Sequence, residues 1–453
     1  MSTLWRTYLP YLISFGIGYL LIFLLSDRRR RIPFSIHAFL SLGLGLGISA
    51  CLTFSSFLIF NQLNTPFVIV INILVLSVLL GLSIFISLKN HIPLVAYKEF
   101  HWRKALPFLV IALFAIPFWR HSHFYAFGGW DAWSTWNLKA RFLFLGGENW
   151  QGLFDPILWR SSPHYPLLLP LINVWGWSFF EQPDYHVPVF TSFVFAFLSV
   201  GLLFASLKKF TGTLWSLLCS LVLLTLPYVV KIALSQYCDS LVGFLLFTSL
   251  LCLISAKKEN NRGYILLAGL FVGFLSFAKN ESLVAAVILC GLCIPYFLWK
   301  NRNEGKKKTL TLFFVTAFIA FLPTITFYVF YAPRSLTVIN GLVSKTDPVT
   351  WYRFKVILSF YLTELSHWNW NGLWIVLILG VLFSFKRSVN KTLVIIPAFL
   401  LLYWLVISCY YFINTYFQIE WWMQVSLHRI AFSTLPVLFF WSFSVVWWKQ
   451  EQE

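Results

Sequence analysis

The stretch from Gly128 to Pro170 concentrates side chains that could do chemistry. Its sequence, GGWDAWSTWNLKARFLFLGGENWQGLFDPILWRSSPHYPLLLP, brings acids, bases and tryptophans together within a very apolar chain. Asp131 stands at the start of a helix-compatible segment that two glycine pairs bracket. A carboxylate at that position could be a general base that faces a membrane-embedded substrate. It could equally be a helix N-cap, its oxygen accepting from the amide of Ser134 or Thr135.

Three further clusters combine charged and aromatic residues. Prolines exclude a helix around His164 and Tyr165 and hold both at an interface. Lys279 and Glu281 lie between two apolar segments, where a charge is costly unless it is paired or functional. They could simply neutralise each other, and Arg429 could merely extend its charge to the membrane surface. With Asp131, the candidate residues are Lys139, Arg141, Arg160, His164, Tyr165, Lys279, Glu281, His428 and Arg429.

Composition places these residues in a polytopic membrane protein. The chain is 59% hydrophobic and only 11% charged, whereas soluble domains carry roughly 25% charge. The net charge of +18 suggests basic cytoplasmic loops rather than a nucleic-acid partner. Most of the 7 cysteines lie inside apolar runs and are typical of small packing residues.

Hydropathy predicts an all-α bundle of about thirteen transmembrane helices, with juxtamembrane helices in a first large outer loop, 120–186. Residues 1–104 would be helices outside the common core, and residues 105–453 the catalytic domain. The expected spans are Tyr8–Leu25, Phe34–Phe60, Phe67–Leu88, Ala105–Trp119, 186–207, 213–231, 240–256, 263–279, 281–299, 309–331, 373–385, 391–412 and 429–448.

Charge counting predicts the orientation of the bundle. With Arg28–Arg31 in the cytoplasm, most of the 34 Lys and Arg fall on the inner side and most of the 16 acids on the outer side. The N-terminus would then be outside and the C-terminus inside. Glycine pairs such as Gly43 with Gly47, and Gly269 with Gly273, predict close helix packing.

An acid, several cations and many aromatic rings at an outer membrane face suit one class of reaction. A lipid-linked sugar phosphate needs cations to stabilise its leaving phosphate. The acceptor hydroxyl needs a carboxylate to take its proton, while the sugar and the lipid need aromatic and apolar walls.

The motif WDAW…WNLKAR followed by HYPLLLP resembles the first outer loop of the GT-C glycosyltransferases. The likeness is to bacterial members of the protein O-mannosyltransferase and aminoarabinose transferase superfamily (glycosyltransferase family 39-like), including the RgtA/B/C/D-like group. AKNES at 278–282 and SLHRI at 426–430 resemble later family signatures, and the likeness extends loosely over about 110–450.

The resemblance implies a polyprenyl-phosphate sugar donor, an unidentified glycan, lipid or protein acceptor, and inversion at the anomeric carbon. Asp131 would be the base, and Asp239, in QYCDS, a second acid. Family members often pair two acids in the first loop, but here Ala132 follows Asp131. No metal and no cofactor are expected. Lys279, Arg429, Arg141 and His164 would hold the lipid phosphate.

Two rival functions stay open. A lipid-linked sugar flippase or transporter would place acids and broken helices at mid-membrane depth. An outer-face glycan polymerase or ligase would also use outer-loop Arg and His, but with its key loop late in the chain. In every case the partners include membrane lipid and exclude nucleic acid.

Overall fold

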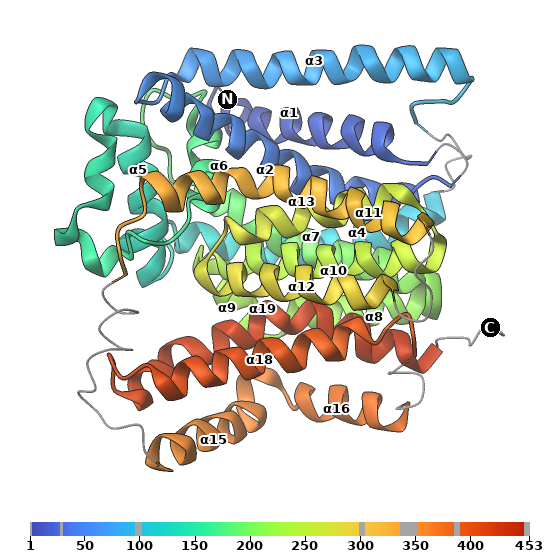
Figure 1. Ribbon diagram of the computed structural model, residues 1–453, viewed down its shortest axis with the longest axis vertical. Helices are drawn as coiled ribbons and strands as arrows, with labels where there is room; N and C mark the ends of the chain where they lie inside the picture. The colour runs from blue at the N-terminus through green and yellow to red at the C-terminus, as the bar shows by residue number, and fades with distance from the viewer. Residues whose placement is uncertain are drawn as a thin grey trace.

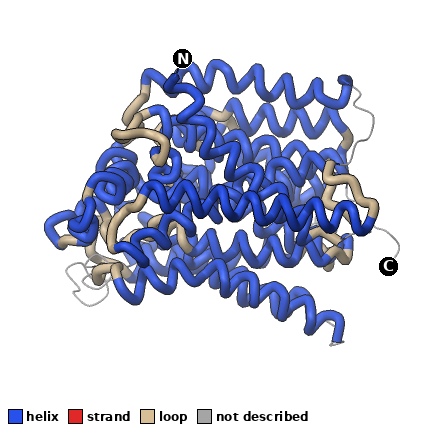
Figure 2. The backbone as a smooth tube through the Cα atoms, turned by 90° about the horizontal axis from the view of Figure 1, so that it is seen from above, coloured by secondary structure: helices blue, strands red, loops and turns tan. Residues whose placement is uncertain are grey.

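The computed structural model describes residues 2–27, 30–95, 102–298, 304–335, 351–384 and 390–447. Within these ranges the chain is helical, no strand occurs, and the loops gather at the two ends of the bundle (Figure 2). This is the expected outcome for so apolar a chain, because a helix satisfies its backbone polar groups without water. The predicted all-α polytopic class is confirmed.

Nine helices among the described residues are long and apolar enough to cross a membrane. They are α1 (Ser2–Leu25), α2 (Phe34–Phe60), α3 (Thr65–Asn90), α4 (Trp102–Phe124), α7 (His186–Thr211), α10 (Asp239–Glu259), α12 (Asn280–Leu298), α13 (Glu304–Phe330) and α18 (Ile395–Ile413).

A tenth span arises if α8 (Thr213–Thr225) and α9 (Pro227–Leu234) are counted together, although they meet at a 60° bend. The remaining elements are shorter or carry more polar residues. They are η1 (Ala132–Trp136), α5 (Asn137–Leu145), η2 (Gly147–Phe154), η3 (Pro156–Ser161), α6 (Leu168–Trp177), α11 (Arg262–Ser276), α15 (Trp351–Ser366), η4 (Trp368–Trp370), α16 (Leu373–Phe383) and α19 (Ile419–Trp447).

A helix lies at each of the thirteen predicted stretches, but several of these helices are short. The number of true spans therefore stays a prediction. The bend between α8 and α9 falls at Pro227, the first residue of α9, which has no N–H to donate to α8 and is favoured at the start of a new helix. The division at residue 104 also stays a prediction, and α1 and α2 pack directly against α6.

The long helices run side by side between two ends of the molecule (Figure 1). One end carries α5 and the other short helices of the first large loop, and we call it the loop end. The opposite end carries Arg30, Lys257 and Lys391, and we call it the basic end. Helix α10 lies at the centre, buried over its whole apolar length, and packs against α7, α11 and α19.

The predicted glycine faces are confirmed as close helix contacts. A Cβ added at Gly43 would lie 2.1 Å from the Phe244 ring, and one at Gly47 would lie 2.6 Å from the Phe274 ring. At Gly269 it would come within 2.5 Å of the Phe313 carbonyl oxygen on α13. Only glycine lets these backbones approach so closely.

Candidate active site

Asp239 is the centre of an ion-pair network at the loop end. It is the first residue of α10, and its side chain is only 2% exposed. The Lys279 ammonium lies 3.1 Å from its Oδ1, and the Arg429 guanidinium Nη2 lies 2.9 Å from its Oδ2. One buried carboxylate therefore holds two cations from segments that are 150 residues apart.

Each of these cations binds a second carboxylate. Arg429 Nη1 lies 2.7 Å from Asp131 Oδ2, and Lys279 Nζ lies 3.3 Å from Glu281 Oε1. The five residues form a chain in which acids and bases alternate, and we call it the ion-pair network. It brings together four of the residues proposed from the sequence with Asp239, the second acid that the resemblance implied.

Backbone contacts hold the first large loop against this network. Gly129 lies two residues before Asp131, and its amide donates to the Ser235 carbonyl at 3.0 Å. Gln236, in the left-handed conformation (φ 57), donates through its side chain to the carbonyls of Tyr125 and Ala126 at 3.1 Å. The loop is thereby fixed to the segment that leads into Asp239.

The structure excludes one of the two interpretations of Asp131, and its role as a general base stays a prediction. Its backbone is already helical (φ −66, ψ −23), and its side chain makes no capping hydrogen bond. The N-cap interpretation is therefore wrong. The side chain is 30% exposed and binds Arg429 instead, so one carboxylate edge is held while the residue still reaches solvent.

Glu281 also presents an unused acceptor. Its Oε1 contacts Lys279, whereas its Oε2 is buried and has no hydrogen-bond partner among the described residues. A buried carboxylate oxygen without a donor costs free energy unless a ligand or a solvent molecule supplies one. Glu281 therefore marks a position where a donor group can bind.

Lys139 takes a different position from the one expected of a substrate contact. Its side chain is fully buried, and its ammonium donates to the carbonyls of Ser162 at 2.7 Å and Tyr165 at 2.8 Å. Burial lowers the pKa of Lys139. Lys139 thereby ties α5 to the segment from Ser162 to Tyr165. Its predicted substrate contact stays a prediction.

Tyr165 lies near both Lys139 and the network, and the His164 ring packs against the Tyr165 ring, 4.9 Å away between centroids. Burial, and next the Lys139 charge, lower the pKa of His164 to about 4, so the imidazole is neutral near pH 7. Burial, and then the carboxylates of Glu281 and Asp131, raise the pKa of Tyr165. A neutral His164 can donate a hydrogen bond to a phosphate but brings no positive charge to it.

The structure does not bring Arg141 or Arg160 into the network. Arg141 is exposed and borders a small pocket together with Asp184 and Tyr185. Arg160 is exposed too, and its guanidinium lies over the Trp159 ring, 5.1 Å from the centroid. The predicted role of Arg141 in phosphate binding and that of Arg160 in substrate binding have no geometric support from the described residues.

His428 belongs to an aromatic cluster that the sequence analysis missed. It stacks on Tyr228 at 5.2 Å between centroids, and Tyr228 stacks in turn on His367 at 5.4 Å. The Trp370 ring lies 4.7 Å from Tyr228, and its indole donates to Glu364 at 2.7 Å. The run HWNW at 367–370 was the available signal, because four hydrogen-bonding or aromatic side chains follow one another there.

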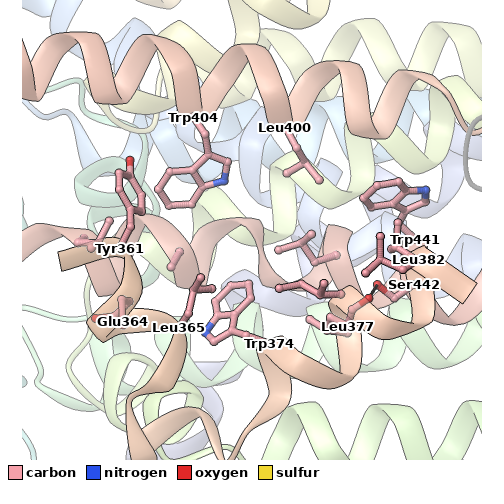
Figure 3. Close-up of a pocket in the computed structure, with 15 residues that line it drawn as sticks. Tyr361, Glu364, Leu365, Trp374, Leu377, Leu382, Leu400, Trp404, Trp441 and Ser442 are labelled. Atoms are coloured by element: carbon pink, nitrogen blue, oxygen red, sulfur yellow. Dashed lines mark hydrogen bonds between the residues drawn. The ribbon is translucent and has the colours of Figure 1, made fainter. Parts of the chain in front are cut away.

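An apolar pocket of about 390 Å³ lies between α15, α16, α18 and α19 (Figure 3). Trp374, Trp404 and Trp441 surround it, and Glu364 connects it to the aromatic cluster. Leu427 and Ala431 of α19 line it, on either side of Arg429 in the sequence. Residues two positions apart on a helix point to opposite faces, so this pocket and Arg429 lie on different faces of α19.

Among the described residues, no group of three or more His, Cys, Asp and Glu has the arrangement of a metal site. The three carboxylates of the network share two cations instead. The expected absence of a metal stays a prediction.

One known protein family has a sequence model that matches part of this chain. Residues 166–327 match the family model described as dolichyl-phosphate-mannose-protein mannosyltransferase. No curated protein and no solved structure matches the chain. The matched region contains Asp239, Lys279 and Glu281, while Asp131 and Arg429 lie outside it. The match confirms the resemblance to the GT-C glycosyltransferases and, with the all-helical fold, indicates a membrane glycosyltransferase of the mannosyltransferase type.

Proposed function

We propose that the protein transfers a sugar from a polyprenyl-phosphate donor to an acceptor hydroxyl on the extracytoplasmic face, with inversion. The observation that carries this proposal is that Arg429 and Lys279 converge with Asp131 around the buried Asp239. One network thus contains two cations that can hold a phosphate. It also contains a partly exposed carboxylate that can accept a proton.

The proposed reaction is a single displacement. The acceptor hydroxyl gives its proton to Asp131 as its oxygen forms a bond to the anomeric carbon. The bond from that carbon to the phosphate oxygen breaks on the opposite face, so the configuration inverts. Negative charge builds up on the leaving polyprenyl phosphate, where Arg429 and Lys279 stabilise it.

The donor has to open the network before it can bind. The network holds three acids and two bases, so an incoming phosphate must replace a carboxylate at one of the cations. The contact between Lys279 and Glu281 is the longest, at 3.3 Å. We expect Glu281 to be displaced first, while Asp239 keeps both cations in place.

The position of the network favours an enzyme over a transporter. Asp239 begins α10, and Lys279 directly precedes α12, so these two charges lie at helix ends rather than at mid-depth, where transport sites are found. Arg429 lies inside α19 and pairs with Asp239 at the start of α10. Lys and Arg at the opposite end support an extracytoplasmic loop end, because basic loops stay in the cytoplasm.

Asp131→Asn tests the proposal. Purified protein in liposomes is given labelled polyprenyl-phosphate mannose, and release of polyprenyl phosphate is measured with protein, glycan and lipid acceptors in turn. We expect wild-type turnover with at least one acceptor, and a loss of about 10²-fold or more in the variant with donor binding retained. Asp184→Asn, which alters a different ion pair at the loop end, is the control. Unchanged turnover in Asp131→Asn would remove the residue from the reaction.

A further inference from the structure

The basic end contains a wide cavity that charged residues border. It has a volume of about 1590 Å³, whereas pockets for small molecules usually measure roughly 300–1,000 Å³. Among the described residues, five cations and a single acid line it. They are Arg30, Lys257, Arg262, Lys306, Lys391 and Asp27. Such an excess of positive charge around one cavity favours an anionic ligand.

Polar and apolar residues occupy different depths of this cavity. Lys257 lies in the last turn of α10, and Arg262 begins α11. Apolar lining residues lie about one turn or more further into the bundle, among them Ile265 on α11, Leu292 on α12 and Ala398 on α18. A ligand that fits this gradient has a charged head at the helix ends and an apolar body that points into the bundle.

The cavity wall is held by hydrogen bonds. The Lys257 ammonium donates to the carbonyls of Tyr296 at 2.9 Å and Lys391 at 2.7 Å, which joins α10 to α12 and to the segment before α18. Asn261, only 2% exposed, accepts from the amide of Gly263 at 2.8 Å and donates to the carbonyl of Arg30. Helices α11 and α18 also begin at this cavity, and helix N-termini favour anions.

We propose that this cavity binds the phosphate head group of an anionic membrane lipid, with the acyl chains along the apolar wall. Basic pockets between transmembrane helices are suited to such head groups. The cavity is distinct from the ion-pair network, because Asp239 and Lys257 lie at opposite ends of α10, roughly 30 Å apart at 1.5 Å per residue. The proposal does not depend on the transferase reaction.

A matched pair of double variants tests this inference. Arg262→Gln with Lys391→Gln removes two cavity charges, and Lys208→Gln with Lys258→Gln removes two charges at the same end that do not line the cavity. Each full-length protein, in a neutral detergent, is titrated with phosphatidylglycerol or with phosphatidylcholine of the same acyl chains. Bound lipid is counted by native mass spectrometry, and thermal unfolding confirms that each variant is folded.

We expect wild-type protein to prefer phosphatidylglycerol. The cavity variant should bind it about 30-fold more weakly, the factor expected for two charges near anionic lipid, and the control variant should bind within threefold of wild type. Equal binding of the two lipids by wild type would overturn the proposal. Inorganic pyrophosphate provides a further arm. Saturable pyrophosphate binding that the cavity variant loses, without any preference between the lipids, would identify a soluble phosphate ligand and reject the lipid.

Discussion

Both ends of the bundle contain Lys and Arg side chains, but the groups that these side chains contact differ. At the loop end, Arg429 and Lys279 each bind two carboxylates. At the basic end, Arg30 donates to the carbonyl of Glu259 at 2.6 Å, and Lys257 donates to two further carbonyls. A carboxylate cancels the charge of its partner, whereas a carbonyl only orients it. The first arrangement therefore holds each cation between carboxylates, and the second fixes basic side chains beside a cavity whose described lining has more cations than acids.

This difference bears on what each end can bind. A ligand at the loop end must exchange with a carboxylate, which demands a close geometric match and suits a reacting phosphate. At the basic end, cations outnumber acids among the described residues that line the cavity, so electrostatic attraction favours an anionic ligand there. Substitutions that exchange or remove these partners can test the contrast.

Asp239→Asn should have the largest effect. Asparagine keeps the shape but leaves two cations without their shared charge, and breaking a buried ion pair costs about 3–5 kcal/mol. We expect a lower unfolding temperature and a loss of transfer that exceeds the loss in Asp131→Asn. The control is Asp184→Asn, whose partner His186 is 38% exposed, with an expected change of about 1 kcal/mol at most. Equal stability of both variants would show that Asp239 is not the centre of the network.

Arg429→Lys should follow in size. The planar guanidinium reaches Asp131 and Asp239 at once, and an ammonium group cannot reproduce this two-sided geometry. We expect kcat to fall by about 10²-fold, with a smaller change in unfolding temperature than in Asp239→Asn because the positive charge remains. Donor turnover under saturation measures the effect. A kcat within threefold of wild type would mean that one charge suffices.

Lys279→Gln and Lys306→Gln compare one lysine from each end. Lys279 is 8% exposed and paired, whereas Lys306 borders the cavity. Loss of the first should weaken transfer by about tenfold or more, since a charge-assisted contact to phosphate is removed. The second should leave transfer within twofold. A comparable loss in both variants would show that the two ends are not functionally separate.

Much of the fold followed from hydropathy, because the apolar runs had to become helices in any membrane bundle. The proximity of Asp131 and Arg429 was also predicted, because both lie in motifs that resemble the family and both were placed on the outer side of the membrane. The central position of Asp239 was not, since a single acid at a helix start gives no sign that two cations will reach it. Lys139 could not be assigned for a similar reason, because its partners are backbone carbonyls, which no sequence motif marks.

Lys139 extends the comparison between the two ends. It lies at the loop end, but it donates to backbone carbonyls, as Arg30 and Lys257 do at the basic end. Lys139→Met keeps much of the volume but leaves the carbonyls of Ser162 and Tyr165 without a donor. An unsatisfied buried group costs about 1–3 kcal/mol, so thermal unfolding should detect the change. A structural role predicts that the KM for the donor stays close to wild type in protein that remains folded. A KM raised tenfold at unchanged stability would restore the predicted substrate contact.

The pKa of His164 makes the stability of the protein depend on pH. Burial, and next the Lys139 charge, lower this pKa to about 4 in the folded protein from an ordinary value of about 6.5. Well above pH 6.5 the imidazole is neutral in both states, so it adds no pH dependence there. As the pH falls from 6.5 towards 4, the unfolded chain binds a proton that the folded protein does not, and stability declines. Between about pH 7 and pH 5.5 the decline should be about 1 kcal/mol, and His164→Gln should remove it. Unfolding measured at both pH values gives the slope. In Lys139→Met the pKa of His164 should rise and the slope should shrink, whereas an unchanged slope would show that burial alone sets this pKa.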